Sequence, residues 1–177
     1  MKQEVIDSLL ARRSIRAYRE EQIPEDVLQT LLRVAKHAPS AMGEQARHFT
    51  VVQDPDIIRQ MTKATLEQFA KLGREPMRPN MPFYLAPTVL VLSAPKEAAW
   101  GHADVACAIM NFMQAAQAYG IGTCYIGAAL GIHRPEIQKL LQIPQGYEPL
   151  ACVTAGYAAE EPAPSKPRRE DDVTYLR

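Results

Sequence analysis

Apolar residues recur along this chain with two different spacings, which divide it into alternating helical and extended segments. The helical spacing is found in five segments, at residues 2–11, 24–38, 56–72, 101–120 and 135–141. Short runs rich in β-branched and other apolar residues predict four strands, at residues 48–53, 88–93, 123–129 and 148–157. Because helices and strands are interleaved without an internal repeat, the pattern predicts one α+β domain over residues 1–177.

Two segments lack either spacing. Residues 73–87 contain four prolines, which are incompatible with a regular helix or a central strand, so we expect a loop that lies over another part of the molecule. Residues 158–177 are rich in proline and charge, and we expect them to form an extended C-terminal arm without a core of its own.

The helical segment at 101–120 is apolar on nearly every side. A helix of this kind has to be covered all round, and a domain of this length has few elements with which to surround it. Part of the cover is therefore expected to come from a second copy of the chain, so the sequence predicts a homodimer.

The charge balance argues against nucleic acid as a partner. The chain has 20 Lys and Arg against 20 Asp and Glu, whereas nonspecific nucleic-acid binding depends on clustered cations. The first residues lack the apolar stretch of a signal peptide, and no segment approaches the roughly 20 apolar residues that span a bilayer. We expect a cytoplasmic protein without a membrane partner, whose three cysteines, Cys107, Cys124 and Cys152, are reduced core residues.

The common signatures of metal-dependent and nucleophilic enzymes are missing from the sequence. There is no HExxH, GxSxG or Walker sequence, no Cys and His cluster at metal-ligand spacing, and the four histidines are scattered, so we predict no metal site and no catalytic histidine. Gly120-Ile121-Gly122 follows a helix and lacks the third glycine of a dinucleotide-binding turn. We therefore expect Gly120 to end that helix in a left-handed conformation.

A cationic stretch after the first helix offers the clearest binding chemistry. If this stretch is extended, Arg12, Ser14 and Arg16 point to one side, where two guanidinium groups and a hydroxyl form a phosphate clamp. Lys166 and Arg168 form a second cationic group in the arm. Composition alone leaves two interpretations open, because a solvated run of surface charge has the same appearance.

Three motifs, in order along the chain, give it a resemblance to a known family. An Arg-x-Ser-x-Arg stretch after the first helix is followed by Ala-Pro-Ser-Ala-Met-Gly-Glu-Gln at 38–45 and by Gly-Ile-Gly-Thr-Cys-Tyr-Ile-Gly at 120–127. With a basic tail near the C-terminus, this order resembles the nitroreductase family of FMN enzymes over nearly the whole chain. The resemblance implies an α/β sandwich around a mixed, mostly antiparallel sheet, built as an intertwined homodimer with FMN at the subunit interface.

The same resemblance assigns cofactor-binding roles by position. The implied FMN-binding residues are Arg12, Arg13, Ser14, Arg16, Lys166 and Arg168 at the phosphate and ribityl chain, Pro39, Ser40 and Gln45 from the partner subunit, and Tyr125, Ile126 and Gly127 beside the ring. A backbone N–H of the last group is expected near flavin N5, where it favours the reduced anionic flavin. By their chemistry, Arg78 and Asn80 are candidates for holding the pyrimidine edge.

The activity that the resemblance implies is ping-pong reduction. NADH or NADPH delivers hydride to flavin N5 and leaves, and a small electron-poor acceptor such as a nitroaromatic or a quinone then takes the electrons in the same pocket. This chemistry needs no catalytic side chain, and none is predicted. Two alternatives remain, which are a flavin-binding or sensing module without NAD(P)H turnover and a cofactor-free dimeric interaction protein.

The sequence departs from the family pattern in one short stretch. The family usually has Asn at the position of Gly43, and Pro followed by an aromatic residue at the positions of Ala46 and Arg47. The missing Asn amide removes an expected hydrogen bond at the flavin or its surroundings, and the charge of Arg47 is expected to alter what stacks over the ring.

Overall fold

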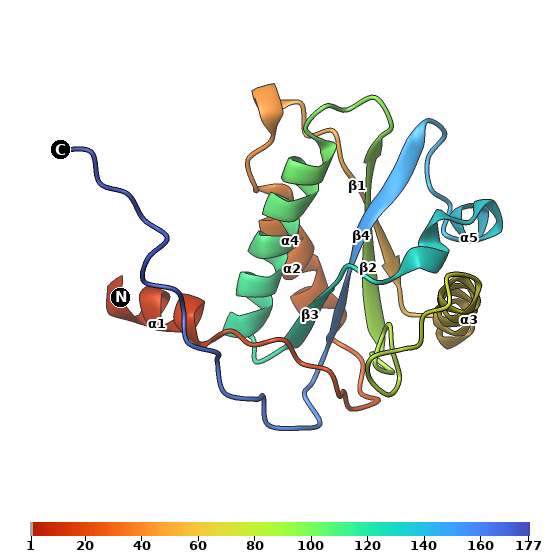
Figure 1. The fold of residues 1–177 in the computed structure, drawn as a ribbon, viewed down its shortest axis with the longest axis horizontal. Helices are drawn as coiled ribbons and strands as arrows, with labels where there is room; N and C mark the ends of the chain where they lie inside the picture. The colour runs from red at the N-terminus through yellow and green to blue at the C-terminus, as the bar shows by residue number, and fades with distance from the viewer. Residues whose placement is uncertain (1) are drawn as a thin grey trace.

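The computed structural model describes residues 2–177, and in this range four strands form one sheet between two helical layers (Figure 1). The strands are β1 (His48–Val52), β2 (Thr88–Pro95), β3 (Gly122–Ile126) and β4 (Tyr147–Gly156). Their order across the sheet is β1-β2-β4-β3, and each pairing is antiparallel. The expected loop at residues 73–87 precedes β2, whose side chains are buried along nearly the whole strand.

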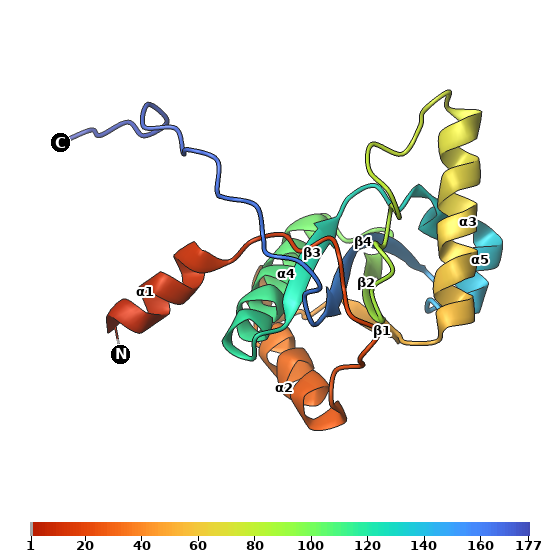
Figure 2. The ribbon, with the colours of Figure 1, turned by 90° about the horizontal axis from the view of Figure 1, so that it is seen from below.

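Four of the five helices in the described residues, α2 to α5, divide between the two faces of the sheet (Figures 1 and 2). Their bounds are α1 (Lys2–Ala11), α2 (Glu25–Lys36), α3 (Pro55–Lys71), α4 (Gly101–Ala118) and α5 (Pro135–Leu140), with short 3₁₀ turns η1 (Ala41–Gly43) and η2 (Leu130–His133). Helices α2 and α4 cover one face, and α3 and α5 cover the other, each over its own apolar core. The predicted α+β sandwich is confirmed.

The chain start is attached to the β3 edge of the sheet. Ser14 forms a parallel bridge with Thr123, and the Ile15 N–H donates to the Thr123 carbonyl at 3.0 Å. Tyr18, in turn, bridges the chain just after β4, and its buried hydroxyl lies 2.8 Å from Thr154 Oγ1 and 2.7 Å from the Ile15 carbonyl. Burial raises the pKa of Tyr18, so its hydroxyl stays protonated and available for these hydrogen bonds.

Helix α1 and the C-terminal arm extend away from the packed body (Figure 2). None of the residues of α1 is buried, although Val5, Ile6, Leu9 and Leu10 are apolar and between 44% and 69% exposed. The arm from residue 158 onward is likewise exposed over most of its length. These two segments therefore leave apolar and backbone surface without cover from their own subunit.

The structure corrects one prediction for the long apolar helix. Helix α4 is covered on one side, whereas its other side remains open in the subunit, with Met110 46% exposed. Cys107 lies on this open side, so its predicted core position is wrong, while Cys124 and Cys152 are buried as expected. The three thiols are unpaired. Gly120 follows α4 with a φ of +68°, which confirms the predicted left-handed end of the helix.

The third strand is shorter than predicted. Apolar residues continue past Ile126 to Ile132, which suggested a strand over 123–129, but the chain leaves the sheet after Ile126 and forms η2. Ala129 and Ile132 then point into the core beneath α3. A run of apolar residues fits either conformation, and packing against α3 decides between them.

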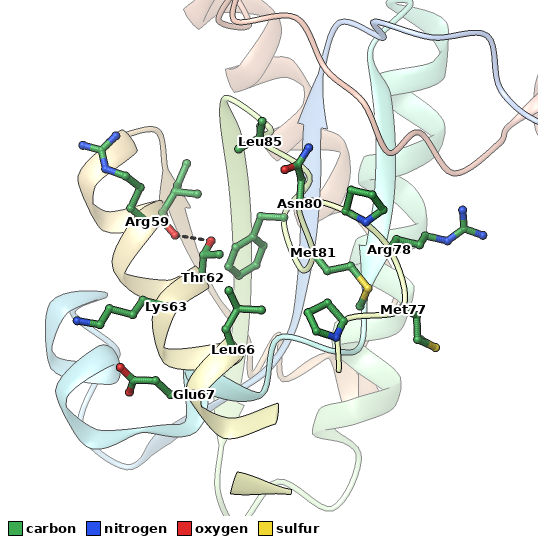
Figure 3. A pocket seen from close by; sticks show the side chains of 14 residues that line it. Arg59, Thr62, Lys63, Leu66, Glu67, Met77, Arg78, Asn80, Met81 and Leu85 are labelled. Atoms are coloured by element: carbon green, nitrogen blue, oxygen red, sulfur yellow. Dashed lines mark hydrogen bonds between the residues drawn. The ribbon is translucent and has the colours of Figure 1, made fainter. Parts of the chain in front are cut away.

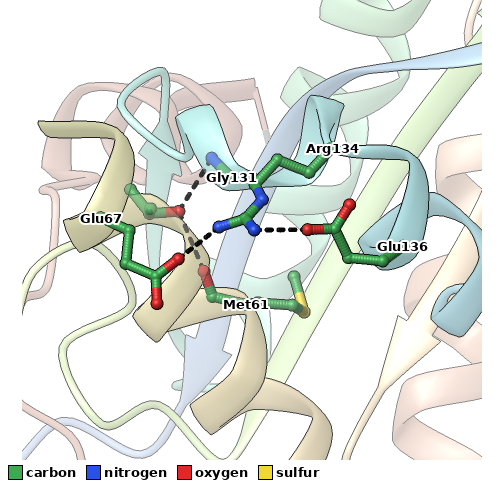
Figure 4. Close-up of polar contacts among 6 residues, drawn as sticks. Met61, Glu67, Gly131, Arg134 and Glu136 are labelled. Atoms are coloured by element: carbon green, nitrogen blue, oxygen red, sulfur yellow. Dashed lines mark hydrogen bonds and ion pairs between the residues drawn. The ribbon is translucent and has the colours of Figure 1, made fainter. Parts of the chain in front are cut away.

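An ion-pair network joins η2 and α5 to α3 (Figure 4). The Arg134 guanidinium bonds Glu67 Oε2 and Glu136 Oε1, each at 2.5 Å. The hydrogen bond from Arg134 lowers the pKa of Glu67, and the backbone N–H of Glu136 together with Arg134 lowers the pKa of Glu136. Conversely, the bond to Glu67 raises the pKa of Arg134. The network is partly exposed, so we expect a modest effect on stability.

The lowered carboxylate pKa values give this network a defined dependence on pH. Because both carboxylates ionise more readily in the folded chain, their stabilising effect is fully present above the ordinary pKa of 4.5 and is lost as the pH falls from there through their lowered pKa values in the folded chain. Arg134→Met should therefore lower the free energy of unfolding at pH 7 but much less at pH 3.5. Urea unfolding of both proteins at the two pH values measures this difference. An equal difference in the free energy of unfolding at both pH values would contradict the stabilising role given to the two ion pairs.

Within residues 2–177, no helix combines the length and the apolar character needed to cross a membrane.

Candidate functional site

Three predicted clamp residues gather around one buried thiol. Residues 12–16 are extended along β3, so that Ile15 is buried in the core while Ser14 and Arg16 lie on the other side. Burial raises the pKa of Cys124, whereas Arg16 and Ser14, which lie beside the sulfur, and the positive charge of Arg12 act in the opposite direction. The alternation predicted from the sequence therefore brings these groups together.

One atom of this cluster has no hydrogen-bond partner among the described residues. Arg12 Nη1 is buried without an acceptor. A buried guanidinium N–H without an acceptor is energetically costly, so it fits an anionic oxygen supplied by a ligand. The neighbouring Arg13 differs, because its guanidinium donates to the carbonyls of Leu10 at 2.7 Å and Arg12 at 2.9 Å. Its side chain is engaged at the end of α1.

The end of β3 lies beside this cluster. Because Ser14 pairs in parallel with Thr123, the following residues of both segments run in the same direction, and Tyr125 continues along the same edge as Arg16. Tyr125 is half exposed, Ile126 is buried, and the space around Gly127 is open, since a Cβ at that position would meet no atom within 4 Å. A flat ligand could therefore approach the backbone closely at Gly127.

The second group of predicted residues lies in the loop between α2 and β1. Pro39, Ser40 and Gln45 line a hollow of about 500 Å³. Ser40 Oγ accepts a hydrogen bond from the Gln45 N–H at 2.9 Å. Gly43 has a φ of +72° and open space around it. Glycine adopts this conformation without strain, which explains why Gly43 fits the turn.

The two groups stand at opposite edges of the sheet within one subunit. The clamp and residues 125–127 belong to the β3 edge, whereas the 39–45 loop leads into β1 at the other edge. Figure 1 shows the η1 turn of this loop at the top of the view and the extended start of the chain below. One chain therefore holds two separate halves of the predicted site.

The remaining candidates lie outside both halves. Lys166 and Arg168 are exposed on the arm. Arg78 and Asn80 border an open cavity of about 1070 Å³ between α3 and the 76–85 loop, lined mainly by apolar side chains. In Figure 3, Leu66 and Met81 face this space, while Arg78 extends away from it. The structure does not join Arg78 to the clamp residues.

Two charged residues that sequence reasoning missed or misread hold the 39–45 loop. Asp104, near the start of α4, is 6% exposed and accepts a hydrogen bond from the Ala41 N–H at 2.9 Å. Arg47, expected to place its charge near a ligand ring, is 9% exposed and bonds backbone carbonyls of its own subunit. Asp104 is a charged residue in a mostly apolar helical segment, which is a signal that the sequence offers, whereas Arg47 lies in a polar stretch that gives no such signal.

Comparison with known proteins identifies the family. The model of the Nitroreductase family matches residues 9–157. The chain belongs to the nitroreductase family. It is 31% identical to an NADH dehydrogenase of Thermus thermophilus over 88% of this chain and 87% of that one, and 28% identical to an FMN reductase [NAD(P)H] of Bacillus subtilis over 98% and 75%. The crystal structure of a nitroreductase with bound FMN from Bacteroides fragilis superposes with a TM-score of 0.88, at 29% identity and over 98% and 99% of the two chains.

Proposed function

We propose that this protein is an FMN-dependent oxidoreductase that uses NADH or NADPH to reduce a small electron-poor acceptor, such as a nitroaromatic or a quinone. Family membership and relatives described as FMN reductases and FMN-bound nitroreductases support the proposal. The observation that carries it for this chain is the buried, unpartnered Arg12 Nη1 beside Ser14 and Arg16. A phosphate group is the ligand that such a donor set fits best.

The clamp residues fix one end of the cofactor. Arg12 and Arg16 supply fixed positive charge for the phosphate dianion, and Ser14 adds a hydroxyl donor, while Lys166 and Arg168 of the arm add charge from outside the body. Arg13 contributes through its backbone, since its guanidinium already bonds two carbonyls. The phosphate group thus anchors and orients the whole ligand.

The other residues position the ring. Tyr125, Ile126 and Gly127 lie along one side of it, where the open space at Gly127 allows close approach of the backbone. When bound, FMN supplies the chemistry, accepting hydride from NAD(P)H and returning electrons to the acceptor. The protein binds and orients, and we assign no side chain as acid or base.

The functional unit that we propose is a homodimer. Pro39, Ser40 and Gln45 lie at the sheet edge opposite the clamp, so they reach a flavin only if it is bound by the partner subunit. The exposed apolar side chains of α1 and the open side of α4 supply surface for such an association. Sedimentation analysis should give a dimer with one FMN per chain, and a monomer that binds FMN stoichiometrically would contradict this arrangement.

The location that we propose is the cytoplasm. The three unpaired thiols support it, because the cytoplasm keeps cysteines reduced.

The activity is tested by an anaerobic titration. The protein is purified, supplied with FMN and freed of excess, and NADH or NADPH is then added while the flavin absorption is recorded. We expect a flavin spectrum that bleaches with one or both donors and returns when a quinone is added. A coloured protein that neither donor bleaches would instead indicate a flavin-binding module, and a protein that does not retain FMN would indicate a cofactor-free interaction protein.

A further inference from the structure

Arg47 is a buried cation that makes three hydrogen bonds to main-chain oxygens. Its guanidinium donates to the carbonyls of Lys36 at 3.0 Å, Ala38 at 2.7 Å and Pro39 at 3.0 Å. Lys36 ends α2, so its carbonyl is one of those that a helix leaves without an intrahelical partner. A positive charge at this end is also favoured by the helix dipole. The bond from Arg47 to Lys36 spans eleven residues and closes the whole loop.

The loop that Arg47 closes has an unfavourable backbone. Met42 and Gln45 have φ values of +52°, in the left-handed region that residues other than glycine seldom adopt. Such conformations cost free energy and persist where surrounding contacts enforce them. The loop therefore needs contacts that hold it in place, and the described residues provide two. Arg47 holds its base, and the Asp104 carboxylate accepts a hydrogen bond from the Ala41 N–H near its tip.

The attachment depends on the chemistry of the Arg47 side chain, which donates to three carbonyl oxygens at once. An aromatic side chain fills space but cannot donate several hydrogen bonds to carbonyl oxygens, whereas the planar guanidinium can. The Arg47 guanidinium therefore bonds groups of its own subunit, at the base of the loop that carries Pro39, Ser40 and Gln45.

We infer that Arg47 is a positioning residue, which holds the 39–45 loop in the shape that the partner subunit's flavin site requires. The inference rests on the proposed function, because that function makes the loop part of a flavin site. Arg47 is buried and acts through the backbone at Pro39. Its loss should change how well FMN is held more than how stable the folded chain is.

The test compares Arg47→Met and Arg47→Lys with the unaltered protein. In the FMN-free protein, amide hydrogen exchange at Ala41 and Gln45 should accelerate about tenfold in Arg47→Met, the size of effect expected when charge-assisted bonds are lost. The Kd for FMN, measured by flavin fluorescence, should rise by about the same factor. In Arg47→Lys, the exchange rates and the Kd for FMN should lie between those of Arg47→Met and those of the unaltered protein, because an ammonium keeps the charge but not the fork of donors.

Two control variants separate positioning from general stability. Arg59→Met removes an exposed cation of α3 in the opposite layer and should leave both readouts unchanged. Ile137→Ala removes a buried side chain of α5 and should lower the melting temperature without raising the Kd for FMN. If Arg47→Met raises the Kd no more than Ile137→Ala does, the inference is wrong.

The design also keeps the inference separate from the proposed function. If the unaltered protein does not bind FMN, the proposed function fails, whereas the exchange rates still show whether Arg47 holds the loop. Unchanged exchange in both Arg47 variants would overturn the inference even in a protein that binds FMN. If Arg47→Met does not fold, Arg47→Lys decides by the same two readouts.

Discussion

Replacing both Arg12 and Arg16 with alanine is expected to weaken FMN binding by at least about 100-fold. Each guanidinium would make charge-assisted hydrogen bonds to the phosphate, worth about 1.5 to 3 kcal/mol apiece. Arg12 Nη1 is already buried without a partner, so the folded protein provides this donor in advance. The Kd for FMN, obtained from quenching of flavin fluorescence, measures the loss.

A matched control for this double substitution lies three residues further along the same segment. Arg19 is exposed and contributes its backbone N–H to the Tyr157 carbonyl, so Arg19→Ala removes one positive charge of the same kind without touching the clamp. Its effect on the Kd for FMN should be small, and far below half of the effect of the double variant, which removes two positive charges, because exposed charge is screened by solvent and salt. If the double variant binds FMN as tightly as Arg19→Ala, the phosphate clamp has been assigned to the wrong residues.

Gly131→Ala is expected to cause the largest loss of stability from a single methyl group. A Cβ at this position would lie 2.4 Å from the backbone nitrogen of Thr65 and 2.6 Å from the carbonyl carbon of Ala64. These are backbone atoms of α3, which cannot rotate away as a side chain would. The Gly131 N–H also donates to Thr65 Oγ1 at 3.1 Å, and separation of the two elements would break this bond (Figure 4).

The cost of this overpacking should be about 3 kcal/mol or more. For a chain of this length, we expect the melting temperature to fall by roughly 6–12 °C. Gly127→Ala, four residues earlier, is the control for the FMN-free protein, because its new methyl group would meet no atom within 4 Å. Thermal unfolding followed by circular dichroism compares the two. Equal melting temperatures would show that η2 does not pack on the α3 backbone as described.

The sequence was sufficient to predict the order and type of the main elements. Helical spacing located α1 to within the bounds that the structure gives, and the apolar run at 88–93 located β2. In contrast, the turns η1 and η2 were missed, because short 3₁₀ turns have no periodicity of their own. Their conformation depends on partners distant in sequence, such as Asp104 for the loop and Thr65 for Gly131.

The candidate site was predictable to a different extent in its two halves. Alternation along an extended segment is a local property, and it is consistent with Ser14 and Arg16 lying opposite the buried Ile15. The use of Arg47 could not be read from the sequence, because its three acceptors are backbone carbonyls and every residue type has one. The exposure of Cys107 was missed for a related reason, since apolar neighbours in the sequence do not indicate which side of a helix is covered.

The hydrogen bond between Tyr18 and Thr154 joins residues 136 positions apart, so the two ends of the packed body meet at the β3 edge. Contacts of such high sequence separation form late in folding, because the chain must give up the entropy of a long loop before they are made. During synthesis, the segment that carries Arg12 and Arg16 leaves the ribosome early but has to wait for β4 before it can be fixed in place. A nascent chain should therefore acquire its affinity for the phosphate group of FMN only when nearly all of the protein has been made.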